Sequence, residues 1–304
     1  MRCAVTGGSG FIGSHVVDKL KDAGHEVRVI DHRVWPHRDD VEFKDVDIVH
    51  FSSVLNATRE VDVIFHLAAM SNVNVAFDQP VYTVELNALG TAHVLEAARI
   101  NGIKRVILAS TVWVYGVAEP DEVDEYSPFQ LRRPGHIYSS MKIASELLCH
   151  DYWNLYKQPF TILRYGIPYG PRMRDELVIP IFLKKAFSGQ PITIAGDGSQ
   201  YRNFIYVEDM AEAHVLALDE KAENKIFNLE GGEKVRIRDI AETINKLLGG
   251  SVKIEYVPAR QGDFKGKQVS REKAKKVLGW EASTTFEQGM EKTIKWFKEK
   301  NNLA

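Results

Sequence analysis

Val5-Thr6-Gly7-Gly8-Ser9-Gly10-Phe11-Ile12-Gly13, near the start of the chain, decides the fold. The residues before it predict a short buried strand, and the apolar residues after it recur on one face of a helix. Glycines at such a strand-to-helix turn allow a tight bend, a close approach of a pyrophosphate and close helix packing. The first helical N–H groups then face the phosphates. The predicted cofactor contacts of this turn are Gly7, Gly10, Phe11, Ile12 and Gly13.

A second predicted strand, 25–30, ends at Asp31. A carboxylate about 20 residues beyond the glycines hydrogen-bonds the adenine ribose and repels a 2′-phosphate. Arg33 is a counter-signal, because an arginine there could meet that phosphate. The balance predicts NAD as the cofactor, and not NADP.

The composition is that of a globular protein with one large core, because 44% of its 304 residues are hydrophobic and the net charge is −2. No basic run indicates a nucleic-acid partner, and no apolar run or signal-peptide pattern indicates a membrane partner. We therefore expect a cytoplasmic protein. Cys3 and Cys149 are predicted to be buried and unbonded, and the ten histidines lack metal-ligand spacing, so no metal is expected.

Strand and helix patterns alternate through the first half of the chain, which predicts an α/β fold with a Rossmann-type, doubly wound parallel sheet. Residues 1–165 are predicted to form the NAD-binding domain, and 202–230 to return to it. Residues 166–201 and 231–304 are predicted to form a smaller α+β lobe that binds substrate.

Tyr138 and Lys142 form a Y-x-x-x-K sequence at the start of a predicted helix, 138–156. A spacing of four places both side chains on one helical face. The lysine ammonium lowers the pKa of the phenol, which could then act as a general base near neutral pH. Thr111 ends a predicted strand, 104–111, at the edge where such sheets bind ligands. Thr111, Tyr138 and Lys142 are therefore the predicted catalytic residues.

Ten motifs spread along the chain resemble the extended short-chain dehydrogenase/reductase family, in its nucleotide-sugar epimerase/dehydratase branch. They lie at 6–13, 66–69, 87–91, 110–116, 138–142, 169–172, 196–202, 204–207, Asp209 and 260–263. The resemblance implies that Asp47 and Ile48 flank the adenine. It also implies further cofactor contacts from Leu67, Ala68, Ala69, Asn87, Tyr138, Lys142 and Tyr165.

On the substrate side, the resemblance implies a UDP-sugar held by Thr111, Arg174, Arg202, Arg260 and Asp263. It also implies a homodimer formed through the helices at about 87–100 and 138–156.

Two positions depart from the family pattern. Val112 and Trp113 stand where the 4,6-dehydratases have Asp-Glu, so no acid there can protonate a departing hydroxide. We expect these two side chains to point to opposite faces of a strand end. Ile167 stands where the family usually has a substrate-contacting Asn, which UDP-glucuronate 4-epimerases also lack.

The resemblance and its departures together imply a UDP-sugar 4-epimerase that acts on UDP-glucose and UDP-galactose through a 4-keto intermediate. A UDP-glucuronate 4-epimerase is the closest alternative, since the arginines within 172–174 could serve a carboxylate. A 4,6-dehydratase, an NAD-linked reductase and a non-catalytic nucleotide-sensing protein also stay open.

Overall fold

The computed structural model describes residues 1–32, 34–116, 122–132, 135–258 and 268–303. The chain divides into two compact units. Unit 1 comprises Met1–Tyr165, Ala211–Leu229 and Val269–Glu281; unit 2 comprises Gly166–Met210, Glu230–Gln268 and Ala282–Ala304.

Two predicted boundaries need correction. The first returning segment begins at 211 and not at 202, and 269–281 was wrongly assigned to the substrate lobe. Hydrogen bonds explain the second difference, because Ser270 N donates to Val123 O at 2.8 Å and Asn228 Nδ2 donates to Ser270 O at 3.0 Å. These long-range contacts leave no pattern in the local sequence.

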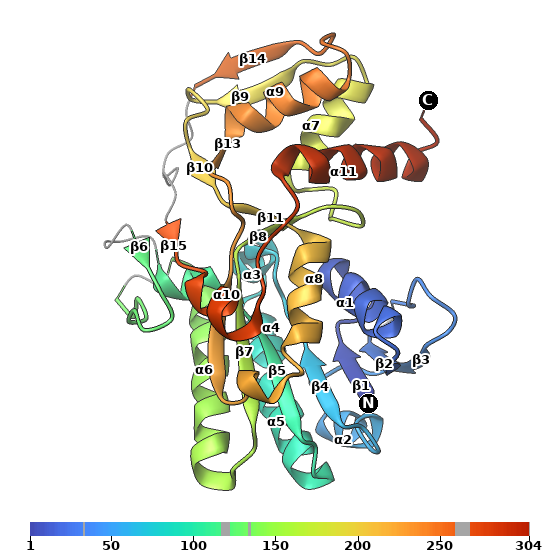
Figure 1. The fold of residues 1–304 in the computed structure, drawn as a ribbon, viewed down its shortest axis with the longest axis vertical. Helices are drawn as coiled ribbons and strands as arrows, with labels where there is room; N and C mark the ends of the chain where they lie inside the picture. The colour runs from blue at the N-terminus through green and yellow to red at the C-terminus, as the bar shows by residue number, and fades with distance from the viewer. Residues whose placement is uncertain (33, 117–121, 133–134, 259–267, 304) are drawn as a thin grey trace. The chain divides into compact units, whose positions relative to one another are not determined.

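Unit 1 is built on a seven-stranded parallel sheet in the order β12-β7-β5-β4-β1-β2-β3, which confirms the predicted fold (Figure 1). The chain runs outward from β1 to β3 and then crosses to β4, on the other side of β1. Ligands of open α/β sheets bind at this reversal, beyond the carboxyl ends of the strands. The strands are β1 (Arg2–Thr6), β2 (Glu26–Asp31), β3 (Glu42–Asp45), β4 (Val63–His66), β5 (Arg105–Thr111), β7 (Phe160–Tyr165) and β12 (Lys225–Leu229).

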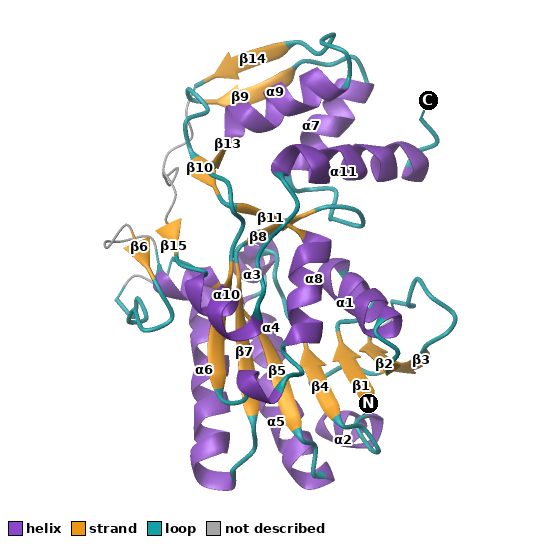
Figure 2. Ribbon diagram, viewed as in Figure 1, coloured by secondary structure: helices purple, strands orange, loops and turns teal. Residues whose placement is uncertain are grey.

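Helices cover both faces of this sheet (Figure 2). Successive side chains of a strand point to opposite faces, so Ile64 on β4 enters the core cluster of Val94 and Leu95 while Phe65 lies 6.1 Å from the ring of His214. The helical segments of unit 1 include α1 (Phe11–Asp22), α2 (Phe51–Ala57), α3 (Val73–Asp78), α4 (Pro80–Val84), α5 (Gly90–Asn101), α6 (Ile137–Tyr156), α10 (Glu272–Leu278) and most of α8 (Val207–Leu216).

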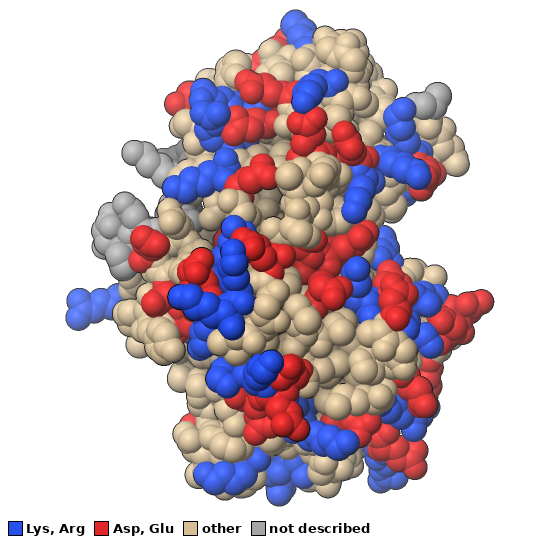
Figure 3. Space-filling view, viewed as in Figure 1, with Lys and Arg blue, Asp and Glu red and all other residues tan. Residues whose placement is uncertain are grey.

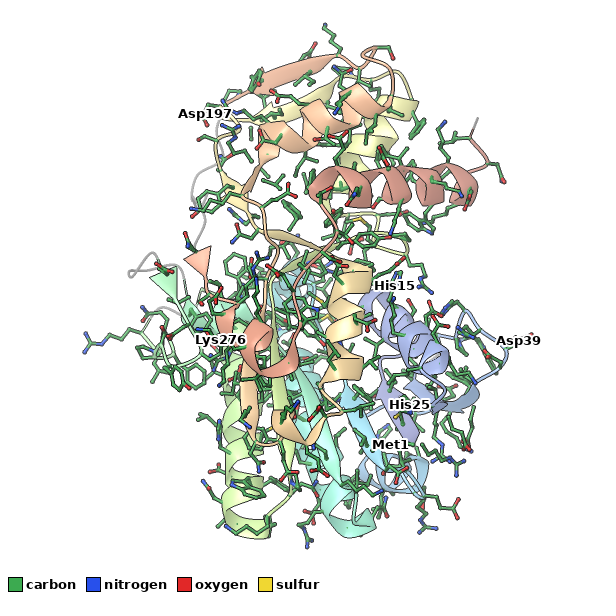
Figure 4. All side chains as sticks on the ribbon, viewed as in Figure 1. Met1, His15, His25, Asp39, Asp197 and Lys276 are labelled. Carbon is green, nitrogen blue, oxygen red and sulfur yellow. The ribbon has the colours of Figure 1, made fainter. Side chains whose placement is uncertain are left out.

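Short elements complete unit 1. A π-helical turn, η1 (Glu85–Leu89), joins α4 to α5, and 3-10 turns form η2 (Val112–Tyr115) and η3 (Glu220–Ala222). The short strands β6 (Glu122–Val123) and β15 (Gln268–Val269) pair with each other. The amino ends of β1 and β2 meet where the N-terminal amine lies 3.3 Å from Nδ1 of His25, and Figure 4 labels both residues. The carboxyl ends that carry the candidate site lie at the opposite edge of the sheet.

Unit 2 is a smaller α+β unit made of two-stranded sheets and helices. Its core includes Tyr169, Phe204, Tyr206 and Phe286, whose rings contact one another at 5.0–6.0 Å between centroids. The strand pairs are β8 (Ile167–Tyr169) with β11 (Phe204–Tyr206), β9 (Ile192–Ala195) with β14 (Ile254–Val257), and β10 (Tyr201–Arg202) with β13 (Val235–Arg236). The helices are α7 (Val178–Phe187), α9 (Ile237–Leu247) and α11 (Phe286–Lys300).

Basic and acidic side chains are interspersed over the face of each unit shown in Figure 3. Within the described ranges, no helix is long and apolar enough to cross a membrane. Cys3 and Cys149 are both buried and free, as predicted.

Candidate active site

The glycine turn between β1 and α1 leaves no room for a side chain at Gly7 or Gly13. Gly7 has a φ of +70° and its N–H donates to Ile30 O at 2.9 Å. A Cβ on Gly7 would lie 2.7 Å from Ala68 N, and one on Gly13 would lie 2.0 Å from Gly7 O. No side chain caps the start of α1 at Gly10, so the first N–H groups of the helix suit an anionic pyrophosphate.

Asp31 lies at the carboxyl end of β2, as the predicted ribose ligand should. Its two carboxylate oxygens accept the N–H groups of Ser9, at 2.9 Å, and His32, at 2.8 Å. Burial raises the pKa of this carboxyl, while these two hydrogen bonds oppose the rise. Each oxygen keeps a lone pair that can accept a ribose hydroxyl. The residues of this turn therefore fit NAD.

A buried histidine ties the carboxyl ends of β1 and β4 to α5. Nδ1 of His66 lies 2.8 Å from Oγ1 of Thr6, and its Nε2 lies 3.1 Å from Oγ1 of Thr91. The Thr91 hydroxyl donates to Asn87 O at 2.6 Å, so His66 Nε2 must carry the proton that bonds Thr91. The Thr6 hydroxyl then donates to Nδ1 and accepts Ala68 N–H at 3.3 Å. Burial lowers the pKa of His66 to about 3, so the imidazole in this series of hydrogen bonds stays neutral.

Asn87, predicted to lie beside the cofactor, holds the loop that follows β4. Its Oδ1 accepts Met70 N–H at 2.7 Å, and its Nδ2 donates to Met70 O at 3.0 Å. The residue sits in the π-helical turn η1, where one wider turn rotates the side chain relative to a regular helix. The predicted contacts Leu67, Ala68 and Ala69 lie in the loop that Asn87 fixes, and Leu67 N donates to Thr6 O at 3.1 Å.

The predicted adenine residues differ in their surroundings. Asp47 Oδ1 accepts Val49 N–H at 3.1 Å, whereas Ile48 is buried in the core cluster. A Cβ on Gly90 would lie 2.6 Å from Cδ1 of Ile48, which shows how closely α5 packs on this side chain. His93 Nδ1, 3.0 Å from Ile48 O, also fixes the backbone here.

Lys142 is anchored beside Tyr138 on α6. Its Nζ donates to Ala109 O at 2.8 Å and lies 5.9 Å from the centroid of the Tyr138 ring. Burial lowers the pKa of Lys142 to about 8, and the charge of Glu146 opposes that fall. Below that pH the ammonium is charged and can stabilise a phenolate at Tyr138. Tyr138 and Lys142 thus lie close together on α6, as their spacing predicts.

Thr111 is the last residue of β5 and the N-cap residue of η2. Its Oγ1 accepts Trp113 N–H at 3.2 Å, which leaves the hydroxyl proton to donate elsewhere. The expectation that Val112 and Trp113 alternate on a strand is wrong, because both lie in this 3-10 turn. Val112 packs on the cluster of Val114 and Tyr115, and the Trp113 ring lies 5.8 Å from that of His136.

A buried ion pair also supports the packing of α6 on β5. Its carboxylate, Glu146, lies one helical turn after Lys142. Glu146 and Arg164 are almost fully buried, and their closest atoms are 2.7 Å apart. Ser110 donates to Glu146, and Arg164 Nη1 donates to the Tyr115 hydroxyl at 2.7 Å. Ala109 and Ser110 of β5 are therefore held by Lys142 and Glu146, which fixes α6 on the strand that ends at Thr111. No local pattern in the sequence predicts this pair, because its two residues lie on different elements.

Tyr165, a predicted cofactor contact, ends β7 beside Thr111. Its hydroxyl lies 2.5 Å from Nε2 of His214 on α8. Burial raises the pKa of Tyr165 well above its ordinary value, so it stays a neutral phenol. Tyr165 therefore does not compete with Tyr138 as a base.

The predicted substrate ligands are distributed between the units. Thr111 belongs to unit 1, whereas Arg174 and Arg202 belong to unit 2. Arg174 pairs with Glu176 at 3.6 Å, and Arg202 Nη1 donates to Tyr201 O at 2.7 Å. Arg260 and Asp263, like Arg33, lie outside the described residues. The contacts of all five predicted ligands with the substrate stay predictions.

Comparison with known proteins shows what this arrangement is similar to. The model of the NAD dependent epimerase/dehydratase family matches residues 3–229. A UDP-N-acetyl-alpha-D-glucosaminuronate decarboxylase of Bacillus cytotoxicus is 34% identical, over 99% of both chains.

Two solved structures share the fold. A UDP-glucose 4-epimerase of Thermotoga maritima, solved with UDP-glucose, has a TM-score of 0.92 and 29% identity, over 99% of this chain and 100% of that one. A UDP-glucose 4-epimerase of Thermus thermophilus in complex with NAD has a TM-score of 0.87 and 34% identity, over 98% and 99%. The chain therefore belongs to the NAD-dependent epimerase/dehydratase family of enzymes, and its cofactor is NAD.

Proposed function

We propose that this enzyme is a UDP-sugar 4-epimerase that interconverts UDP-glucose and UDP-galactose. The observation that carries the proposal is the turn directly after Thr111. Val112 packs into an apolar cluster and Trp113 against His136, so neither position offers a carboxyl group to the substrate. Elimination of water needs an acid for the departing hydroxide, and an indole or an alkyl group cannot serve.

In the proposed mechanism, bound NAD supplies the acceptor and donor of the C4 hydride. The Tyr138 phenolate takes the proton of the sugar 4-hydroxyl and later returns it to the 4-keto sugar. Lys142, 5.9 Å from the Tyr138 ring, stabilises the phenolate by its positive charge. The Thr111 hydroxyl, whose oxygen already accepts Trp113 N–H, donates a hydrogen bond to the sugar O4 and keeps its proton. The keto sugar must then turn within the site, so that the hydride returns to its other face.

A UDP-glucuronate 4-epimerase is the second candidate. The Bacillus cytotoxicus relative is named for a uronic-acid sugar nucleotide, and Arg174 offers a cation for a carboxylate. The test is to incubate the purified enzyme separately with UDP-glucose, UDP-galactose and UDP-glucuronate, and to separate the products. Conversion of the neutral pair supports the first proposal, and conversion of the uronate alone replaces it by the second. A product lighter by one water indicates a dehydratase, and one lighter by one carbon dioxide a decarboxylase. Consumption of added NADH indicates a reductase, and binding without turnover a sensing protein.

Replacing Asp31 by Ala should weaken NAD binding by about 10- to 100-fold, the effect of one or two hydrogen bonds to a charged group. It should also relax discrimination against NADP, because the repulsion of a 2′-phosphate is lost. Asp39→Ala is the control, since this exposed carboxylate, labelled in Figure 4, lies in the loop after β2. Titration of both variants with NAD and NADP by calorimetry measures the difference. A wild-type protein that prefers NADP would contradict the role of Asp31.

We also propose that the enzyme is a homodimer formed through α5 and α6. Both helices expose large apolar side chains: on α6 Leu155 is 70% exposed and Leu147 48%, and Ile100 on α5 is 48% exposed, as is Leu89, the residue before α5, to 46%. Where such side chains form a contiguous apolar patch, the patch marks a protein–protein interaction site. Light scattering on the eluting protein should give twice the chain mass, and a monomer at micromolar concentration would contradict this proposal.

A further inference from the structure

His136 caps the helix that carries the proposed base. It directly precedes α6, two residues before Tyr138, and its main-chain oxygen accepts the N–H groups of Ser139, at 3.0 Å, and Ser140, at 3.3 Å. Its Nδ1 also accepts Ser139 N–H at 3.2 Å and lies 3.1 Å from Ser139 Oγ. Asn, Asp, Ser and Thr are the usual caps, and none of them titrates with a pKa near neutrality as histidine does.

The capping bonds fix the protonation state of the ring. A main-chain N–H can only donate, so Nδ1 must hold a lone pair and the single ring proton must sit on Nε2. A second proton could bind only at Nδ1, where it would displace the main-chain N–H of Ser139, which can only donate. It would also place a positive charge at the positive end of the helix dipole. Burial lowers the pKa of His136, opposed by a main-chain hydrogen bond, so the neutral cap is the resting state at pH 7.

The imidazole of His136 also contacts two aromatic rings of the site, those of Trp113 and Tyr138. Its ring centroid lies 5.8 Å from that of Trp113, on the turn after Thr111, and 5.8 Å from that of Tyr138. The same side chain thus fixes the first turn of α6 and contacts both the base and the turn that Thr111 begins. A substitution or protonation of His136 should therefore change the position of Tyr138.

We propose that His136 is the positioning residue of Tyr138: its neutral imidazole holds the first turn of α6, and its protonation releases that turn. This inference rests on the proposed role of Tyr138 as the base. It does not require His136 to touch the substrate.

The titratable groups around the imidazole are few in the described part of the site. Tyr138 faces it from α6, and Lys142 follows one turn later, with its Nζ 5.9 Å from the centroid of the Tyr138 ring. Trp113 faces it from η2 and does not titrate. Arg132, on the preceding segment, is exposed. No charged side chain is among the causes of the pKa shift of His136, so its titration follows its own burial and capping.

The proposal predicts how kcat depends on acid pH. Activity is lost when Tyr138 binds a proton, and it falls by about a further fivefold when His136 binds one, the cost of an uncapped first turn. In the wild-type enzyme, log kcat should therefore fall with a slope above one over the pH range in which His136 titrates. His136→Asn keeps a side-chain oxygen that can cap α6 but does not titrate. Its slope should be one, and its kcat near pH 8 should stay within about threefold of wild type. His136→Ala, which has no cap, should lose about fivefold at every pH and also show a slope of one.

A second measurement needs no turnover. Hydrogen–deuterium exchange of the NAD-bound enzyme, followed by mass spectrometry, reports on residues 137–142, with a peptide from α5 as internal reference. After correction for the intrinsic rate, exchange at 137–142 should speed up several-fold in the wild type at acid pH and stay unchanged in His136→Asn. Equal exchange in both proteins would overturn the proposal.

The two measurements separate the possible failures. If His136→Asn loses more than 100-fold in kcat near pH 8 while its exchange is unchanged, His136 acts on the substrate and is not a positioning residue. If it keeps the slope above one, another group supplies the second proton and the proposal is overturned. If exchange behaves as expected but no UDP-sugar is turned over, the pH-sensitive cap is supported and the proposed function has failed.

Discussion

Tyr138→Phe should lower kcat by about 10²–10⁴-fold, the usual effect of removing a general base. The substitution deletes the ionisable oxygen and leaves the ring that packs on His136 and Lys142. NAD should therefore stay bound, and the melting temperature should hardly change. The measurement is the rate of UDP-glucose conversion, with NAD content determined on the same preparation.

Two variants make this result specific. Tyr126→Phe removes a hydroxyl from a ring that is 84% exposed and should leave kcat unchanged. Thr111→Val should cost less than Tyr138→Phe, because water can partly replace a hydroxyl that shares the proton. Wild-type activity in Tyr138→Phe would leave the proposed mechanism without its base.

Lys142→Met should lower kcat by at least about 10²-fold, because a neutral side chain cannot stabilise the Tyr138 phenolate. Met has a similar length and removes the charge from a fully buried position. In the wild type the pKa of Lys142 is lowered to about 8, so its charge is present below that pH and lost above it. Wild-type kcat should thus decline above about pH 8, and the residual activity of Lys142→Met should lack that decline.

The matched control is Lys104→Met. Lys104 is exposed and pairs with Asp62 at 2.8 Å, at the opposite edge of the sheet, so its loss should not alter the pH profile. An alkaline decline that persists in Lys142→Met would assign it to another group.

The parts of the site that follow from local spacing could be predicted from the sequence. The glycine turn could be predicted because a Cβ at Gly7 or Gly13 would collide with the backbone, a constraint that only glycine meets. Tyr138 and Lys142 could be paired because a helix places residues four apart on one face. The sheet followed from the alternation of apolar strands and amphipathic helices.

What could not be predicted depends on contacts between distant segments or on unusual turns. The return of 269–281 to unit 1 depends on hydrogen bonds with Val123 and Asn228. The π-helical turn at Asn87 and the 3-10 turn after Thr111 interrupt regular patterns, and the glycine that follows each of them, Gly90 or Gly116, does not reveal which kind of turn precedes it. A histidine cap at 136 was missed for a similar reason, since histidine is not among the usual capping residues.

The most direct test of the central claim uses UDP-glucose with deuterium at C4 and the NAD-bound enzyme, without added cofactor. If Tyr138 moves the O4 proton while the C4 hydride leaves and returns within one site, the product is UDP-galactose of unchanged mass. It keeps the deuterium at C4, and no reduced nicotinamide accumulates in the ultraviolet spectrum. A product lighter by one water or one carbon dioxide, or UDP-galactose that has lost its deuterium to the solvent, would contradict the account.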